Sequence, residues 1–274
     1  MKGMQPRTRF APTPSGFLHW GNIFNFCLIW RYARLHQGSI VLRIDDLDLA
    51  RTQEDSLADI FETLNWLGFN WDEGPQDLAD FKRHHSQQLR MNYYFDSLKH
   101  IPHYACECSR ADLLARGEES YDGHCRHKQL SFRPGHHQLR LLATDPKHDV
   151  VVWRKENLAA YHWVSVLEDE RSRINTIFRG EDLRESSEVQ RELALSAGLS
   201  FYPNAQIFHH PLLLSENNLK LSKSDQTESI REWRLKGKSR TEVFRELSRR
   251  ANWPSGIESL SDLLENNAVD PSTE

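Results

Sequence analysis

The order of apolar and polar positions predicts a strand, a loop and a helix at the start of the chain. Residues 7–10 are typical of a short strand, which the prolines and glycines of residues 11–22 bring to an end. Apolar residues then recur at helical spacing up to a stop at Gly38, namely Ile23, Phe26, Cys27, Trp30 and Ala33.

A second strand and a second helix follow. The run SIVLRI, residues 39–44, is rich in β-forming residues. The sequence TQED from Thr52 is similar to a capping box and opens a helix that ends before Gly68, with an apolar stripe at Leu57, Ile60, Phe61, Leu64 and Leu67. Such a βαβα opening is typical of a doubly wound parallel sheet.

The middle of the chain has a different character. Residues 85–135 are rich in histidine, arginine and tyrosine and lack a sustained period, so we interpret them as an insertion. Strands are predicted again in DVVVWR, HWVSVLED, INTIFRG and QIFHHPLLL, with a helix over residues 187–197 between the last two. From residue 227 the pattern is helical and charged, and the tail from residue 265 is expected to fray.

These patterns predict an α/β protein with a Rossmann-type doubly wound parallel sheet. The sheet domain is predicted to be split over residues 1–84 and 136–226, around the insertion at 85–135. Residues 227–274 form a short helical C-terminal segment in this prediction.

Composition and charge narrow the class of protein. The chain has 274 residues, 38% of them hydrophobic and 27% charged, which predicts a soluble globular protein. No apolar run is long enough to span a bilayer and the N-terminus lacks the apolar middle of a signal peptide, so we expect a cytoplasmic protein, with a monomer as the default. The net charge of −4 gives no general sign of nucleic-acid binding, but residues 231–250 hold eight Lys or Arg against three Glu.

The loop after the first strand has the form of a phosphate site. A strand that runs through a glycine-containing loop into a helix presents backbone N–H groups and the positive end of a helix dipole. Neither a P-loop nor a dinucleotide fingerprint is present, and an ordinary connecting loop explains this stretch equally well. A second segment, NNLKLSKSD at residues 217–225, predicts a cationic arm that can stabilise charge developing on phosphorus.

The cysteines indicate a metal site. Cys106, Cys108 and Cys125 lie within about twenty residues of one another, and in a cytoplasmic chain zinc explains such a group better than a disulfide does. Reduced cysteines without a metal are the alternative. A closed tetrahedral site needs a fourth ligand, and chemistry alone favours a histidine over a tyrosine; the candidates are Tyr121, His124, His103 and His127.

Two short motifs together resemble a known family. The residues His-Trp-Gly-Asn at 19–22 are similar to the HIGH motif of class I aminoacyl-tRNA synthetases, and residues 220–224 are similar to their KMSKS motif. The stretches RFAPTPSGFLHWGN, LRIDDLD, YHWVSVLEDE and FRGEDLRESSEVQ resemble, in order and approximate spacing, the glutamyl and glutaminyl subgroup of that class.

The resemblance implies that ATP and an amino acid form an aminoacyl-adenylate with loss of pyrophosphate. It implies catalytic roles for His19, Lys220 and Lys223, and it places ATP, with Mg²⁺, at His19, Gly21, Asn22 and Lys223. Catalysis of this kind is mostly positioning and cationic stabilisation of the phosphate. Asn22 stands where the motif has its second histidine.

The resemblance also implies an amino-acid pocket. In it Arg9 and Arg179 pair with carboxylates, Asp45 holds the ammonium group, and Tyr161 and Thr13 donate or accept hydrogen bonds. The glutamate enzymes of the subgroup read RIED where this chain reads RIDD, so glutamate and glutamine both stay open as substrates. A structural alternative for the two arginines is a salt bridge to Asp45, Asp46 or Glu181.

The zinc spacing is similar to that of small members of the subgroup that attach glutamate to queuosine in tRNA(Asp). This likeness implies Tyr121 as the fourth ligand of a structural zinc, beside Cys106, Cys108 and Cys125. Only residues 225–274 follow the KMSKS-like motif, which leads us to expect the same activity here, with tRNA(Asp) as partner and the basic segment against its backbone. The alternatives are a minimal enzyme that charges the 3′ end of a tRNA and a catalytically silent RNA-binding paralogue.

Overall fold

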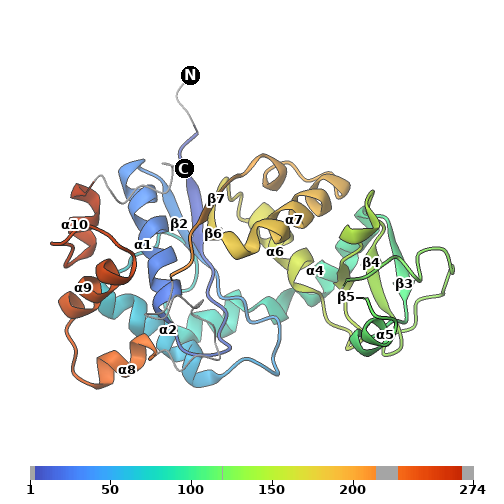
Figure 1. Cartoon of the computed structure of the whole chain (residues 1–274), viewed down its shortest axis with the longest axis horizontal. Coiled ribbons are helices and arrows are strands. Elements are labelled where there is room, and N and C mark those ends of the chain that lie inside the picture. Colours follow the sequence, from blue (N-terminus) through green and yellow to red (C-terminus); the bar gives the residue numbers. More distant parts are fainter. Residues whose placement is uncertain (1–3, 119, 214–227, 267–274) are drawn as a thin grey trace. The chain divides into compact units, whose positions relative to one another are not determined.

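A computed structural model describes residues 4–118, 120–213 and 228–266, which fold into two compact units (Figure 1). The first unit combines the chain up to residue 89 with residues 174–184 and the chain from residue 206 onward. The second unit combines residues 90–173 with residues 185–205. Among the described residues, no helix is both long and apolar enough to cross a membrane.

The first unit is built on parallel strands, as the sequence predicted. Strand β1 (Arg7–Phe10) pairs in parallel with β2 (Ser39–Leu42), and β6 (Thr176–Gly180) pairs in parallel with β7 (Gln206–His210). The two pairs lie side by side, because the Asn175 N–H donates to the Arg7 carbonyl at 3.0 Å and the Arg7 N–H donates to Asn175 Oδ1 at 2.8 Å. Parallel strands of this kind present their carboxyl ends at one edge.

Helices from both ends of the chain share the core of the first unit. These helices are α1 (Trp20–Leu35), α2 (Glu54–Leu67), α3 (Leu78–Asp80), α8 (Ile230–Leu235), α9 (Arg240–Arg250) and α10 (Leu260–Glu265). Ile29 of α1, Val243 of α9 and Leu263 of α10 are buried in the same hydrophobic cluster. The buried Arg31 guanidinium donates to the Leu263 carbonyl at 2.6 Å and to the Asn266 carbonyl at 2.9 Å, so it satisfies backbone groups at the end of α10.

The second unit holds an antiparallel sheet in the order β3–β4–β5. Its elements are β3 (His103–Cys106), β4 (Gln138–Leu141), β5 (Val151–Trp153), α4 (Met91–Asp96), α5 (Arg110–Ala115), α6 (Tyr161–Arg171) and, apart from its first residue, α7 (Arg184–Ser196). The buried Asp149 carboxylate accepts hydrogen bonds from the Tyr104 hydroxyl at 2.8 Å and the Ala143 N–H at 2.9 Å. It also pairs with Arg126 at 3.2 Å, and this network fixes the loops beside the sheet.

One predicted strand is wrong. The run HWVSVLED lies within helix α6, where Trp163, Val164, Val166 and Leu167 are all buried. Its valines favour a strand by propensity, but their spacing equally suits a helix, and packing decides the outcome for a segment buried on all sides. The segment is long enough for three helical turns, which is the feature that separates it from a short buried strand.

The compact units cut the chain at other positions than the predicted domains. Residues 136–173 and 185–205 pack with the cysteine-containing segment, because β4 and β5 pair with β3, and not with the parallel sheet. The helices after residue 227 belong to the first unit, whose core they complete. Residues 90–135 of the predicted insertion at 85–135 are therefore only part of the second unit, and residues 85–89 belong to the first.

Candidate active site

The loop between β1 and α1 is held in place by backbone hydrogen bonds from three separate segments. The Pro12 carbonyl accepts from the Asp45 N–H at 2.9 Å and the Pro14 carbonyl accepts from the Gln53 N–H at 3.0 Å. The Leu18 carbonyl accepts from the Ile230 N–H at 2.9 Å. The carbonyls of the two prolines thus accept hydrogen bonds from the chain that follows β2. These bonds fix the path of the loop at the carboxyl end of β1.

His19 caps the N-terminus of α1 with its side chain. Its Nδ1 accepts a hydrogen bond from the Gly21 N–H at 3.1 Å, while Asn22 Oδ1 accepts from the His19 N–H at 3.0 Å. This is a capping box with His at the cap and Asn at the third helical position. Because Nδ1 is an acceptor here, a neutral imidazole carries its proton on Nε2 and can donate from that side.

Gly21 lets the imidazole reach this position. A Cβ at Gly21 would lie 3.1 Å from Cε1 and 3.3 Å from Nδ1 of His19, closer than ordinary van der Waals contact. A side chain at Gly21 would therefore push the imidazole off the helix end. The resemblance predicts that ATP binds at Gly21, where the absence of a side chain would let a ligand approach the backbone.

Asp45, predicted to hold an ammonium group, has an arginine and an amide as its neighbours. Arg43 Nε donates to Asp45 Oδ1 at 2.7 Å and Arg43 Nη2 donates to Oδ2 at 3.2 Å, with both side chains nearly buried. Gln87 Nε2 donates to Asp45 Oδ1 at 2.8 Å. This arrangement fixes the orientation of the carboxylate before any ligand arrives.

The neighbouring acid, Asp46, has a structural position. Its buried carboxylate accepts from the Ser86 hydroxyl at 2.5 Å and from the Gln87 N–H at 2.7 Å. Asp46 thereby ties the segment before residue 90 to the end of β2, and it places Gln87 against Asp45. The two acids of the RIDD run therefore differ in their surroundings.

Arg9 and Arg179 both lie on parallel strands of the first unit. Arg9 is 6% exposed on β1 and Arg179 is 4% exposed on β6, where each is one residue from the end of its strand. Buried guanidinium groups at such an edge are suited to bind carboxylates, since a low dielectric strengthens the interaction. Thr13, in the loop after β1, is exposed.

The structure does not test the assignment of three other predicted residues to this site. Tyr161 is the first residue of α6 in the second unit and is 46% exposed. Lys220 and Lys223 lie outside the described residues. Their assignments to the pocket remain predictions.

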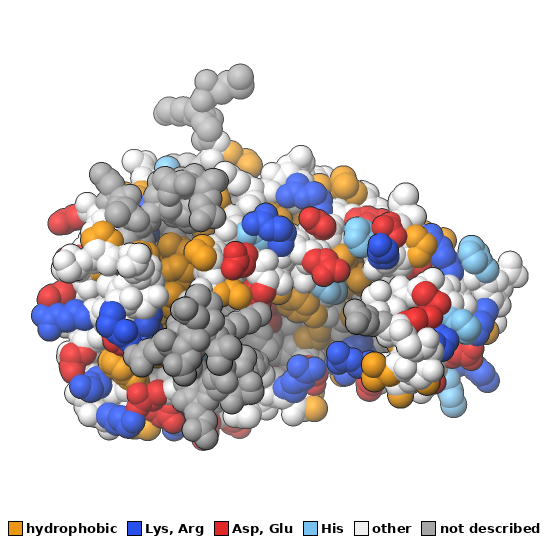
Figure 2. Space-filling model, in the orientation of Figure 1, with side chains coloured by type: hydrophobic (Ala, Val, Ile, Leu, Met, Phe, Trp, Pro, Cys, Tyr) orange, Lys and Arg blue, Asp and Glu red, His pale blue; other side chains and the backbone are white. Residues whose placement is uncertain are grey.

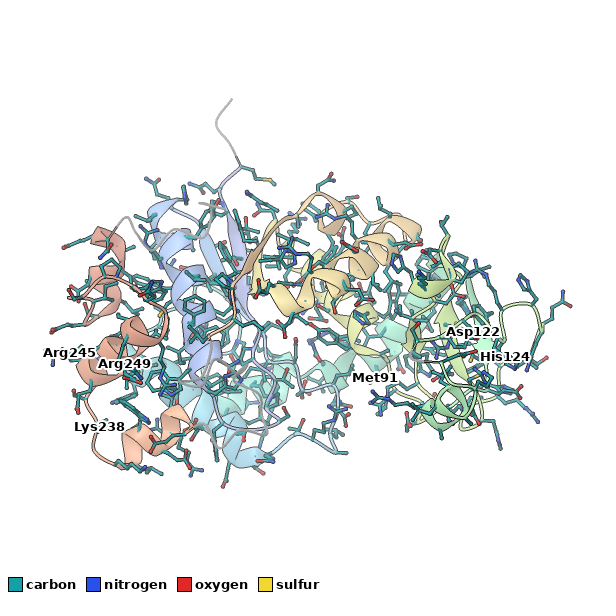
Figure 3. The ribbon with its side chains drawn as sticks, viewed as in Figure 1. Met91, Asp122, His124, Lys238, Arg245 and Arg249 are labelled. Carbon is teal, nitrogen blue, oxygen red and sulfur yellow. The ribbon has the colours of Figure 1, made fainter. Side chains whose placement is uncertain are left out.

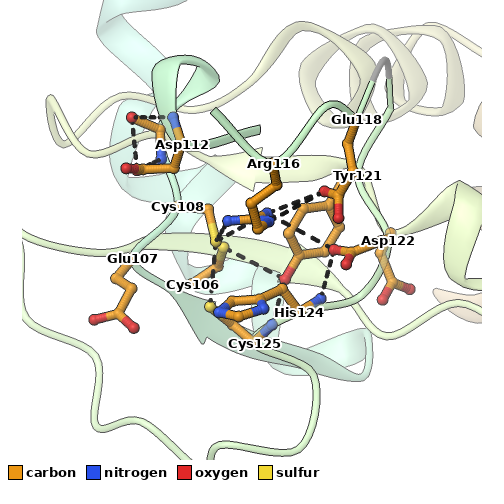
Figure 4. A network of polar contacts seen from close by, with 12 residues as sticks. Cys106, Glu107, Cys108, Asp112, Arg116, Glu118, Tyr121, Asp122, His124 and Cys125 are labelled. Carbon is orange, nitrogen blue, oxygen red and sulfur yellow. Dashed lines mark hydrogen bonds and ion pairs between the residues drawn. The ribbon is translucent and has the colours of Figure 1, made fainter. Parts of the chain in front are cut away.

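The three cysteine sulfurs gather in the second unit (Figure 4). All three side chains are buried, and their sulfurs lie within 4.8 Å of one another. Cys108 Sγ is 3.5 Å from Cys125 Sγ, and Cys106 Sγ is 3.6 Å from the Tyr121 hydroxyl oxygen. A tetrahedral site with Zn–S bonds of about 2.3 Å separates its sulfurs by about 3.8 Å, so the donor set fits zinc.

Tyr121 is better placed as a fourth ligand than His124 or His103. Its buried hydroxyl oxygen accepts from the Cys125 N–H at 2.8 Å and lies beside Cys106. The exposed His124 instead contacts Lys128, with 2.9 Å between Nε2 and Nζ, and the exposed His103 has its Nδ1 at 2.9 Å from the Ile101 carbonyl.

The surroundings of the sulfurs are partly cationic. Two Arg116 nitrogens are 3.9 Å from Cys108 Sγ, Gln138 Nε2 donates to Cys106 Sγ at 3.7 Å, and the Arg140 guanidinium carbon lies 3.7 Å from the centre of the Tyr121 ring. Burial, with the adjacent Cys125 thiol adding to it, raises the pKa of Cys108 to about 12. A bound cation would reverse this preference, because thiolates are the form that ligates metal.

The basic C-terminal segment is largely neutralised by acids. Figures 2 and 3 show positive side chains along α8 and α9, with Lys238, Arg245 and Arg249 at one edge of the first unit. Among the described residues, seven of the eight Lys and Arg of residues 231–250 nevertheless have a carboxylate oxygen within 4.0 Å, and Arg240 has none. The segment is therefore less cationic than its composition indicated.

A sequence profile of the tRNA synthetases class I (E and Q), catalytic domain, matches residues 5–141 and 138–270 of this chain. The chain belongs to this family. Among its curated relatives are glutamate–tRNA ligase 1 of Syntrophus aciditrophicus, 32% identical over 250 residues, and the glutamate–tRNA ligase of Methylacidiphilum infernorum, 34% identical over 245 residues. These matches cover 82% and 85% of this chain and 51% of each relative, so the chain spans about half the length of the curated relatives it matches.

Solved structures show the same class I synthetase fold. The glutamate–tRNA synthetase of Elizabethkingia anophelis superimposes with a TM-score of 0.76 at 20% identity, over 97% of this chain and 66% of that one. A glutamate–tRNA ligase of Elizabethkingia meningosepticum gives 0.72 at 19% identity, over 97% and 65%. The α/β architecture of the class I synthetases is confirmed by these likenesses.

Two residues beside the candidate site were not predicted from the sequence. Arg43 precedes Asp45 by two positions, and alternate residues of an extended segment point to one face, so their pairing could have been read from the LRIDD run. Gln87 follows Asp45 by more than forty residues, and no local pattern connects them. Hydrogen bonds from Gln87 N–H to the Asp46 carboxylate and from Gln88 Nε2 to the Asp46 and Leu47 carbonyls hold this segment beside Asp45.

Proposed function

We propose that this protein activates glutamate with ATP and transfers the glutamyl group to queuosine at the wobble position of tRNA(Asp). ATP, as its magnesium complex, would bind at His19, Gly21 and Asn22, with Lys220 and Lys223 as further cations. The observation that carries the adenylate-forming step is the His19-capped N-terminus of α1, which follows a strand with a buried arginine in a chain of this family. A helix N-terminus favours the phosphates through its N–H groups and dipole.

The amino-acid pocket is proposed to use the strands of the same unit. Arg9 and Arg179 would pair with the two carboxylates of glutamate, and Asp45 would receive the ammonium group. The support for this is the burial of both guanidinium groups and the fixed orientation of the Asp45 carboxylate. Thr13 and Tyr161 are proposed to complete the pocket through their hydroxyl groups.

The cysteine cluster supports the queuosine-specific assignment. Cys106, Cys108, Tyr121 and Cys125 would hold one structural zinc, which would cross-link the segment after β3 without an open coordination position. The C-x-C and Y-x₃-C spacing is similar to that of the small synthetases that act on queuosine, and the buried Tyr121 hydroxyl supports the same ligand set.

A second candidate is an enzyme that charges the 3′ end of a tRNA with glutamate or glutamine. This alternative is favoured by the names of the curated relatives, which are glutamate–tRNA ligases. When glutamate is its substrate, it shares the adenylate step with our proposal and differs only in the acceptor. A test of the acceptor therefore separates the two.

The first experiment measures exchange of labelled pyrophosphate into ATP, with glutamate, glutamine or neither. We expect exchange with glutamate alone. If zinc-replete protein gives no exchange with either amino acid, the chain is not an adenylate-forming enzyme under these conditions and the RNA-binding alternative takes its place.

The second experiment offers labelled glutamate to tRNA(Asp) prepared with and without queuosine. Our proposal expects label only on the modified tRNA, and this label should remain when the tRNA lacks its 3′-terminal adenosine. Equal labelling of the tRNAs with and without queuosine, or loss of label from the tRNA without its 3′-terminal adenosine, would favour the charging enzyme instead.

A further inference from the structure

The loop that opens α1 is framed by side chains from α8 and α9. The Arg231 guanidinium carbon lies 4.3 Å from the centre of the Phe17 ring, and the Leu18 carbonyl accepts from the Ile230 N–H at 2.9 Å. The Trp20 ring meets the edge of Trp233, at 4.9 Å between centroids and an interplanar angle of 87°.

A second cation completes this frame. The Arg250 guanidinium carbon, at the end of α9, lies 4.9 Å from the centre of the Trp20 ring. Trp20 is 1% exposed, so its indole is held between an aromatic edge and a guanidinium group inside the protein. Contacts of both kinds are stronger when they are shielded from water.

These contacts fall on the residues on both sides of His19. The Leu18 carbonyl accepts a hydrogen bond and the Trp20 ring packs against Trp233. The residues on both sides of His19 are therefore held in place, and with them the His19 backbone. The imidazole then takes its place on the helix end through its bond to the Gly21 N–H. A small rotation at Trp20 would move the His19 imidazole and the Gly21 N–H together.

We propose that Trp233 and Arg250 are positioning residues for the nucleotide-binding end of α1. They act through Trp20, which they hold so that His19 and the Gly21 N–H keep one geometry toward the phosphates of ATP. This inference rests on the proposed function for the identity of the nucleotide. It assigns to α8 and α9 a role in ATP binding that differs from contact with RNA.

The amino-acid side of the site has other supports. Arg9 and Arg179 lie on β1 and β6, and Asp45 is held by Arg43 and Gln87. A change in the position of Trp20 should therefore raise KM for ATP more than KM for glutamate. This difference separates a positioning role from a general loss of folding, which would raise both KM values or reduce the amount of active protein.

The chain offers a matched control for Arg250. Arg249 and Arg250 both bond to Glu246 Oε1, at 2.8 Å and 2.7 Å, on the same helix. The Arg249 side chain is 55% exposed, whereas that of Arg250 is 19% exposed and faces Trp20. Replacing either arginine by methionine removes one ion pair with Glu246, but only one of the two changes removes the cation over the indole.

The test compares Arg250→Met, Trp233→Leu and Trp233→Phe with two controls, Arg249→Met and Leu235→Ala, in the full-length protein. Leu235 is 72% exposed on α8. In the pyrophosphate exchange assay we expect Arg250→Met and Trp233→Leu to raise KM for ATP about three- to tenfold, with KM for glutamate within about twofold of wild type. Trp233→Phe should restore most of the ATP affinity, and the controls should behave as wild type.

A second arm measures the dissociation constant of a non-hydrolysable ATP analogue for the same proteins by titration calorimetry. If the wild type binds the analogue but shows no exchange with glutamate, the proposed function fails, and the ranking of the variants still tests the positioning role. Equal changes of both KM values, unchanged binding in Arg250→Met and Trp233→Leu, or no nucleotide binding by the wild type would each overturn the inference. Thermal unfolding identifies any variant that fails to fold. If either Arg250→Met or Trp233→Leu does not fold, the other one tests the positioning role.

Discussion

Replacing Arg43 by methionine tests how much Asp45 depends on its buried partner. Methionine keeps most of the apolar stem and removes the guanidinium group that donates to both oxygens of Asp45, at 2.7 Å and 3.2 Å. The pair is nearly buried, with side-chain exposures of 8% for Arg43 and 11% for Asp45. Removing Arg43 leaves the buried Asp45 carboxylate without its opposite charge, which is destabilising.

The cost follows from what remains beside Asp45. Breaking a fully buried pair from one side costs about 3–5 kcal/mol, and the remaining bond from Gln87 Nε2, at 2.8 Å, lowers this figure. We expect Arg43→Met to reduce the free energy of unfolding by about 2–3 kcal/mol. The matched control is Arg7→Met: Arg7 pairs with the half-exposed Glu73, so its loss should cost no more than about 1 kcal/mol.

Urea unfolding near neutral pH, followed by far-UV circular dichroism, measures both changes, and the double variant Arg43→Met/Asp45→Asn completes a thermodynamic cycle. The double variant should lose less stability than the sum of the two single variants, because it removes the buried charge together with its partner. A cost for Arg43→Met that is no larger than that for Arg7→Met, or strict additivity in the cycle, would refute the reasoning.

Three further predictions concern the other sites. His19→Asn should keep the helix cap, with an unfolding free energy within about 0.5 kcal/mol of wild type, whereas His19→Ala should lose about 1 kcal/mol. Both variants should lower pyrophosphate exchange activity if the imidazole contacts phosphate. Unchanged activity in His19→Asn would exclude that contact. Cys108→Ser should lose the bound zinc measured by elemental analysis, while Cys27→Ser, in α1, should retain it; full zinc content in Cys108→Ser would show a wrong ligand set. A hydrogen bond from Lys238 is the largest of the effects that lower the pKa of Glu242 to about 2. The stabilisation by Glu242 is therefore present above about pH 4.5 and is lost as the pH falls toward 2. The difference in urea midpoint between wild type and Glu242→Gln should shrink over that range, and a constant difference would contradict this prediction.

The sequence predicted the parts of the fold that depend on local patterns. The strand at residues 7–10 and the helix that follows it were recognisable because the prolines, glycines and apolar spacing all indicate the same elements. The strand predicted over HWVSVLED failed because valine propensity and helical spacing gave opposite indications, and burial of Trp163 and Val166 in the second unit favoured the helix.

The candidate site divides in the same way. The gathering of three cysteine sulfurs could be predicted from the short spacing of Cys106, Cys108 and Cys125. The capping role of His19 could not, because histidine is not among the residues that usually cap helices. Contacts such as Gln87 with Asp45 join distant segments, so they depend on the tertiary structure and leave no mark in the local sequence.

The C-terminal helices show why composition alone gives a poor indication of function. Eight basic residues over positions 231–250 suggest an RNA surface, yet acids of α9 and neighbouring segments lie beside seven of them. A cation that is already paired releases fewer counterions on binding RNA, so this segment should contribute little to the salt dependence of tRNA affinity. Arg250 pairs with Glu246 and also lies over Trp20, so the same charges that stabilise α9 connect it to the opening of α1. The contacts of these helices therefore favour a role in shaping the proposed nucleotide site over a role in holding the RNA backbone.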